Sequence, residues 1–111
     1  MVSSFLLLAV TWSLLCPQIF VFAQSQALKD CIVKALDGKS SRAAFSNKFL
    51  FDLLDVKRYN LAYKTEPIAV TYPETAQQIS GIVKCAAAAN VFVQARSGGH
   101  SFGNYGQSGS L

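Results

Sequence analysis

A chain of 111 residues has room for one small domain at most. Its ten Lys and Arg outnumber its six Asp and Glu, and the two signs are interleaved along the sequence to leave a net charge of +4. No segment carries a run of basic residues, so the composition argues against a protein that binds nucleic acid.

The first 23 residues contain an apolar stretch without a charged side chain, MVSSFLLLAVTWSLLCPQIFVFA. Pro17 interrupts this stretch, and Val21-Phe22-Ala23 has the small-residue spacing of a cleavage site. The pattern predicts a signal peptide over residues 1–23 and a secreted, extracellular product with no membrane association after cleavage. An uncleaved membrane anchor is the alternative, which Pro17 and the short flanks disfavour.

Removal of Cys16 with the signal peptide would leave an even pair of cysteines, Cys31 and Cys85. In an oxidising compartment two cysteines on apolar helix faces are expected to form a disulfide, with free thiols as the alternative. Two thiols and the single histidine, His100, supply too few ligands for a metal site, so none is expected.

Residues 24–58 are expected to form an N-terminal helix and a connecting loop. Apolar residues recur at helical spacing from Ser25 to Leu36, and Asp37-Gly38 supplies a helix stop. The polar stretch GKSSRAAFSNKF, residues 38–49, predicts a loop. The following stretch is ambiguous, with a strand favoured from Tyr59 to Tyr63.

The stretch from residue 68 to residue 90 predicts a strand followed by a helix. Ile68–Pro73 is a β-branched run ended by proline, and Thr75 with Gln78 forms the pattern of a capping box. Asn90 is the expected helix stop. Four apolar residues would share one face of this helix: Ile79, Ile82, Val83 and Ala86.

A second β-prone run, Val91–Ala95, follows the helix. Strand, helix and strand within about thirty residues form a βαβ unit, in which the strands are parallel and the crossover is right-handed. The expected fold class is therefore α+β, an amphipathic helix followed by a βαβ unit.

The chain ends on ARSGGHSFGNYGQSGSL, which holds His100 and five of the seven glycines. Ligands of α/β sheets gather at the carboxyl ends of strands, where this loop is expected to begin. Its spacing matches neither the Rossmann fingerprint nor the P-loop. Small residues would let several backbone N–H groups approach one phosphate, with Arg96 at the rim. The small residues are Ser97, Gly98, Gly99, Ser101 and Gly103.

Two other interpretations of this loop remain open. Gly99-His100-Ser101-Phe102-Gly103 matches the Gly-x-Ser-x-Gly pattern of a secreted serine hydrolase with Ser101 as nucleophile, although the residues that follow are poor helix formers. The loop could also be a glycine-rich turn of a small disulfide-stabilised secreted protein without a cofactor.

The stretch PIAVTYPETAQQISGIVKCAAAANVFVQARSGGHSFGNYG resembles the start of the FAD-binding PCMH-type domain of the vanillyl-alcohol oxidase superfamily. It is most similar to secreted berberine-bridge-enzyme-like and glucooligosaccharide-oxidase-like flavoproteins. The resemblance covers residues 59–111, about half of the chain. The segment KRYNLAY and the upstream helix cysteine also resemble this secreted subgroup, which supports pairing of Cys31 with Cys85.

The resemblance implies an FAD cofactor and assigns roles to residues of the loop. Arg96 to Ser101 would cradle the pyrophosphate through backbone amides, and His100 would bond covalently to the flavin 8α-methyl carbon. Phe102 stands where Tyr is frequent in the family. Gly103, Tyr105 and Gly106 would continue along the cofactor.

The resemblance further implies a secreted oxidoreductase that oxidises an alcohol or carbohydrate hydroxyl, with transfer of electrons to flavin and then to oxygen. Members of the family are several times longer. We therefore expect residues 59–111 to be the first part of a truncated FAD-binding domain, with the catalytic residues beyond Leu111. The fragment itself is expected to be inactive.

Overall fold

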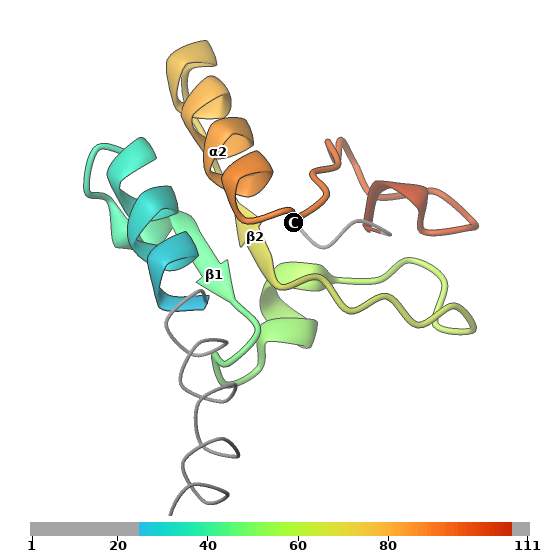
Figure 1. Cartoon of the computed structure of the whole chain (residues 1–111). Coiled ribbons are helices and arrows are strands. Elements are labelled where there is room, and N and C mark those ends of the chain that lie inside the picture. Colours follow the sequence, from blue (N-terminus) through green and yellow to red (C-terminus); the bar gives the residue numbers. More distant parts are fainter. Residues whose placement is uncertain (1–24, 108–111) are drawn as a thin grey trace, which may run out of the picture.

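The computed structural model describes residues 25–107 (Figure 1); the predicted signal peptide lies outside these residues. The described chain is a mixed α+β unit with a helix at residues 25–35 and a two-stranded sheet. The elements that follow this N-terminal helix are η1 (Ser40–Arg42), β1 (Ala43–Phe45), η2 (Asp52–Val56), β2 (Ala69–Thr71), α2 (Ala76–Ala88) and η3 (Tyr105–Gln107).

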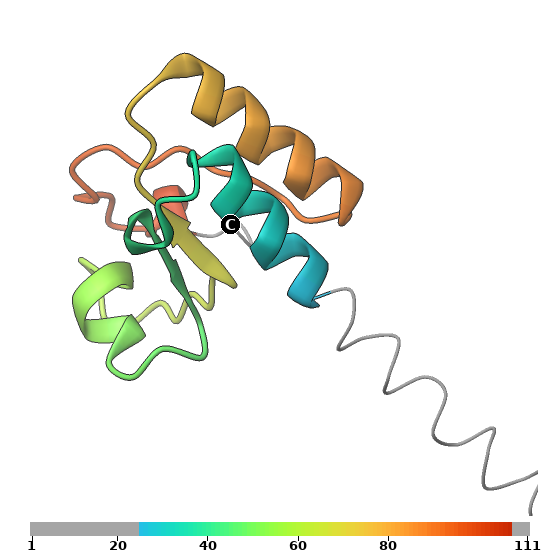
Figure 2. The same cartoon turned by 90° about the vertical axis from the view of Figure 1, so that its left-hand side faces the viewer.

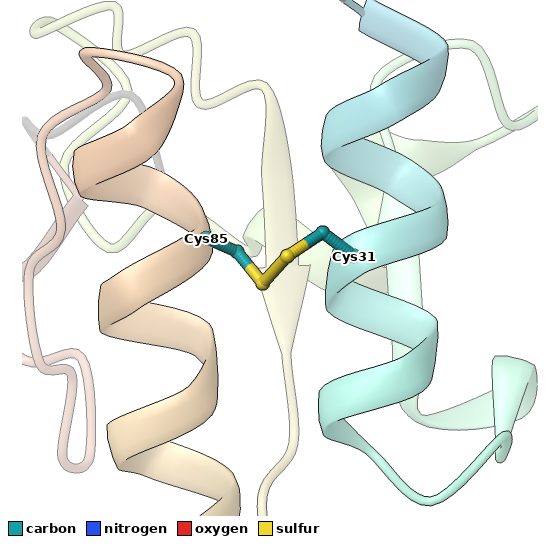
Figure 3. The surroundings of a disulfide bond; sticks show 2 residues. All are labelled: Cys31 and Cys85. Carbon is teal, nitrogen blue, oxygen red and sulfur yellow. A yellow bond between two sulfur atoms is a disulfide. The ribbon is translucent and has the colours of Figure 1, made fainter.

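The N-terminal helix and α2 lie side by side (Figure 2) and are joined by the disulfide Cys31–Cys85, with the two Cα atoms 5.8 Å apart (Figure 3). This is the pair that the sequence predicts. A core cluster fills the contact between the helices, made of Leu28, Ile32, Leu36, Ile82 and Cys85. Burial of this apolar surface stabilises the pairing of the helices together with the covalent bond.

Gly81 allows the two helices to approach closely. A Cβ atom added to Gly81 would lie 2.8 Å from the Cβ of Ala35, well inside van der Waals contact. Glycine in the interior of a helix usually costs stability, because it adds backbone entropy to the unfolded chain. Here it provides the space that places the N-terminal helix against α2.

The sheet pairs β1 with β2 in antiparallel orientation, with Ala44 opposite Val70. Backbone hydrogen bonds from Ser46 N to the Ile68 carbonyl and from Tyr72 N to the Arg42 carbonyl, both 2.9 Å, extend the pairing at each end. A second core cluster lies at this sheet and consists of Ala44, Phe51 and Val56, with Val70 packed against it.

The helix boundaries agree with the sequence prediction. Asp37 (φ 57°) and Gly38 (φ 76°) turn the chain after the N-terminal helix, and Asn90 (φ 55°) does so after α2. At the start of α2 the Thr75 hydroxyl accepts a hydrogen bond from Gln78 N at 3.2 Å. The Gln78 side chain in turn accepts from Glu74 N at 2.7 Å, one residue before the usual capping-box partner.

The prediction of a parallel βαβ unit is wrong for the described residues. Val91–Ala95 forms no strand, and the partner of β2 is β1, within a segment predicted to be a loop. Phe92 is 80% exposed, so this run buries too little side chain to hold it against a neighbouring strand. Tyr59–Tyr63, also favoured as a strand, forms a turn instead.

The predicted apolar face of α2 is only partly buried. Ile82 and Ala86 belong to the core, whereas Ile79 and Val83 are about half exposed. These two side chains face a hollow described below.

Candidate functional site

Two loops that are distant in the sequence meet on one side of the molecule. The first connects η2 to β2 (residues 57–68), and the second runs from Arg96 to η3; Figure 1 shows both projecting away from the two helices. Hydrogen bonds between Asn60 and residues 102–104 join them. His100 and the predicted cofactor-binding residues lie on the second loop.

Arg96 fastens this loop to the end of η2. One guanidinium nitrogen, Nη1, donates to the Val56 carbonyl, and Nη2 donates to the Lys57 carbonyl at 3.1 Å. Cationic side chains are favourable beside the free carbonyls at a helix C-terminus. Arg96 therefore does not extend from the loop rim as expected; it holds the start of the loop in place.

The glycines make room for side chains of the loop itself. A Cβ on Gly99, whose φ is +75°, would lie 2.5 Å from the Arg96 guanidinium, and a Cβ on Gly98 would lie 3.1 Å from the His100 ring. Gly103 gives similar room to the ring of Tyr105. Small residues here thus determine how the loop packs against its own side chains.

Three consecutive backbone amides in this loop fit an anionic group. The N–H groups of Gly99, His100 and Ser101 donate hydrogen bonds to no acceptor among residues 25–107, whereas Gly98 N donates to the Ser97 hydroxyl at 2.6 Å. Successive free N–H groups around a left-handed residue favour binding of phosphate oxygens. The residues present therefore fit one part of FAD, its pyrophosphate.

His100 is exposed and its ring lies against Tyr59. The two ring centroids are 5.4 Å apart and the planes are inclined by 21°, a stacked arrangement. Phe102 contacts the same tyrosine edge-on, with centroids 5.7 Å apart. Tyr59 is thus the common neighbour of two residues predicted to bind the cofactor.

The loops are held together by a pair of asparagines that the sequence analysis did not single out. Asn104 is 2% exposed, and its side-chain amide donates to the carbonyls of Asn60 (2.8 Å) and Tyr63 (2.9 Å). Its Oδ1 accepts from Asn60 N at 3.2 Å, and Asn60 Nδ2 donates to the Phe102 carbonyl at 2.8 Å. We call this set of bonds the Asn60–Asn104 clamp.

One local signal points to Asn104. It follows Gly103 in a turn and has a φ of 52°, a conformation that asparagine tolerates better than most residues. Nothing local indicates that its partner is Asn60, which is 44 residues away.

An apolar hollow of about 410 Å³ adjoins the loop at Arg96 and Gly106. Its walls come from β2, α2 and the extended segment before the loop, and include Val70, Ile79, Ile82, Val83 and Val93. A Cβ on Gly106 would meet its nearest neighbours, in Ala95 and Arg96, at 3.6 Å, an ordinary contact. The hollow is large enough for a ring system that reaches the loop from the side of the sheet.

Asp55, in η2, carries a buried carboxylate. It accepts from Lys48 Nζ at 3.0 Å and from the Tyr72 hydroxyl at 3.3 Å. Burial, and after it the charge of Asp55, raises the pKa of the Tyr72 hydroxyl. Tyr72 therefore stays protonated and able to donate this bond at neutral pH.

Ser101 does not have the surroundings of a nucleophile elbow. That motif needs a strand before the serine and a helix after it. In the described chain, residues 91–96 form no strand and only the short η3 follows. The Ser101 hydroxyl accepts from Tyr105 N at 3.4 Å.

Within residues 25–107, no group of three or more His, Cys, Asp or Glu side chains is placed to hold a metal ion. The helices of the same residues are too short or too polar to cross a bilayer.

Comparison with known proteins identifies relatives named as an FAD-linked oxidoreductase and as oligosaccharide oxidases. The chain is 39% identical over 82 residues to the FAD-linked oxidoreductase sorD of Penicillium rubens, which covers 74% of this chain and 17% of that protein. The chain is similar to FAD-linked oxidoreductases. It is also 33% identical over 84 residues to the chitooligosaccharide oxidase of Gibberella zeae, covering 76% of this chain and 16% of that enzyme.

A third relative is the glucooligosaccharide oxidase of Sarocladium strictum, which is 36% identical over 56 residues, covering 50% of this chain and 11% of the enzyme. The chain thus matches less than a fifth of the length of each of these three proteins. No family model matches it, and no solved structure does.

Proposed function

We propose that this chain forms part of the FAD site of an FAD-linked oxidoreductase that acts on an alcohol or carbohydrate hydroxyl. We assign it to the PCMH-type flavoproteins of the vanillyl-alcohol oxidase superfamily, near the berberine-bridge-enzyme-like members. The observation that carries the proposal is the exposed His100 on a loop that Arg96 holds in place, beside three amides with no acceptor among residues 25–107. Relatives named as FAD-linked and oligosaccharide oxidases support the cofactor and the substrate class.

In this proposal the chain binds and orients FAD. The amides of Gly99, His100 and Ser101 donate to the pyrophosphate, and residues 102–106 continue along the cofactor. When bound, FAD supplies the redox chemistry, which is hydride acceptance from the substrate and electron transfer to oxygen. His100 would hold the flavin covalently, through a bond from a ring nitrogen to the 8α-methyl carbon, and dioxygen would be the acceptor of the two electrons and two protons that formation of this bond releases.

We also propose that the protein is secreted and that the 111 residues alone do not turn over substrate. The disulfide Cys31–Cys85 is typical of an oxidising compartment and supports secretion. Phe102 and Tyr105 are each more than 70% exposed, so the described residues cover only one side of a bound ligand. Contacts from further protein would be needed to enclose FAD.

A chimera tests the covalent linkage. The matching segment of the Gibberella zeae chitooligosaccharide oxidase is replaced by this chain, and flavin fluorescence is read on a denaturing gel. We expect a fluorescent band with the native loop, no band with His100→Ala, and an unchanged band with Ser101→Ala. A soluble chimera that carries no flavin at all would contradict the proposal.

The 111-residue chain provides a second measurement. Titration with ADP, which contains the pyrophosphate group of FAD, should shift the amide resonances of Gly99, His100 and Ser101 and leave those of α2 in place. Unchanged loop resonances at millimolar ADP would contradict the pyrophosphate assignment. Labelling of Ser101 by a fluorophosphonate probe would favour the hydrolase instead.

A further inference from the structure

The environment of His100 includes a residue to which no role has been assigned. Tyr59 stacks on the imidazole ring, and it comes from the other loop, 41 positions earlier in the chain. The tyrosine is itself half exposed, so its ring is not in this position because a core encloses it. The position of the Tyr59 ring is set by the hydrogen bonds of the next residue, Asn60.

The Asn60–Asn104 clamp fixes both rings relative to one another. Tyr59 is adjacent to Asn60, and His100 lies four residues before Asn104. The Asn60 side chain is used at both ends, since Nδ2 donates to the Phe102 carbonyl and Oδ1 accepts from Ala62 N at 2.9 Å. The clamp thus sets the distance between the two loops on which the stacked rings are carried.

Stacking holds an imidazole in a way that suits bond formation at its edge. Tyr59 covers a face of the ring, while the two nitrogens lie on the ring edge. Among residues 25–107 no hydrogen bond involves a ring nitrogen of His100. One face of the ring is therefore covered, while neither nitrogen is engaged in a hydrogen bond among these residues.

We propose that Tyr59, held by the Asn60–Asn104 clamp, is a positioning residue that orients His100 for its bond to FAD; this rests on the proposed function. The tyrosine touches neither the reacting carbon nor the substrate in this assignment. It reduces the number of orientations that the imidazole ring can adopt. A larger fraction of the remaining orientations then places the nitrogen toward the flavin methyl group, which raises the rate of bond formation.

The first test is made on the 111-residue chain without cofactor. A ring stacked on tyrosine experiences its ring current, so the carbon-bound ring protons of His100 should resonate upfield of their positions in an unstructured peptide. Tyr59→Leu should remove this shift, and the matched variant Tyr59→Phe should keep it. Ring protons of His100 at unstructured positions in the native chain would contradict the stack and overturn the proposal.

The second test is made on the chimera. We expect covalent attachment of FAD to be at least about tenfold slower in Tyr59→Leu, because misplacement of a reacting group has a large effect on rate. Tyr59→Phe should stay within about twofold of the native rate. The comparison uses chimeras whose thermal melting confirms that they are folded.

The outcomes separate the two proposals. If Tyr59→Leu attaches FAD at the native rate while His100→Ala attaches none, the positioning role is wrong and the proposed function stands. If neither the native chimera nor His100→Ala attaches flavin, the covalent linkage is wrong, and no positioning role toward FAD remains. Slower attachment in Tyr59→Leu with recovery in Tyr59→Phe supports the role of the aromatic ring.

Discussion

Asn104 has a larger part in this loop than its place among glycines indicates. Its side chain is buried and uses both donor hydrogens and its oxygen, and its backbone has the left-handed φ of 52°. A substitution removes three hydrogen bonds at once and leaves the carbonyls of Asn60 and Tyr63, which take part in part-buried bonds, without this partner. Unpaired buried polar groups cost more than the lost bonds contribute.

Asn104→Ala is therefore expected to destabilise the chain by about 2 kcal/mol, which lowers Tm by roughly 10 °C for a unit of this size. Thermal unfolding followed by circular dichroism measures the change. Asn104→Gly serves as the control for backbone strain, because glycine adopts positive φ freely. If the hydrogen bonds dominate, the glycine variant is nearly as unstable as the alanine variant; a native Tm in either would contradict this explanation.

Some candidate site residues could be proposed from the sequence and others could not, because only some of them are marked by a local pattern. His100 and the glycines could be proposed as site residues because their pattern is local and contiguous. The contacts of Arg96 with the Val56 and Lys57 carbonyls, and of Asn104 with Asn60, join residues about 40 positions apart. No local spacing encodes such pairs, because they depend on how the loops fold over one another.

Among the elements, the helices agree with the sequence predictions better than the strands do. Each helix carries its own boundary signals, such as the Thr75 cap and the left-handed Asn90. A strand needs a partner, and the short run Ala43–Phe45 has little β-propensity of its own. It pairs with β2 because Ala44 and Val70 share the second core, which a single sequence does not reveal.

Thr75→Ala should lower the stability of the chain by about 1 kcal/mol, because Gln78 N loses its side-chain acceptor. Urea unfolding measures the loss, and Thr75→Ser, which keeps a hydroxyl, should recover most of it. Equal midpoints for the native chain and Thr75→Ala would show that the cap contributes nothing measurable.

For the molecule as a whole, the larger of the two buried clusters in residues 25–107 lies where the N-terminal helix packs on α2. One small cluster of five buried residues lies between these helices, and the disulfide links positions 54 residues apart. A core of this size contributes little on its own, so small secreted domains commonly rely on such a bridge.

The double variant Cys31→Ser/Cys85→Ser is expected to lose about 4 kcal/mol, the chain-entropy value for a loop of this length. That loss is comparable to the whole stability of many small domains, so the variant should be largely unfolded at 37 °C. Circular dichroism and urea unfolding measure this loss of stability. The native chain in excess dithiothreitol should be destabilised to the same extent as the double variant. A reduced chain with native stability would show that the helices pair without the bridge.

The Asn60–Asn104 clamp also has a consequence for the conditions under which the loop keeps its shape. All its donors and acceptors are neutral amides and carbonyls, so neither acidity nor ionic strength acts directly on the bonds that hold the two loops together. The loop that carries His100 is thus joined to its neighbour by bonds that do not depend on the ionisation of any side chain.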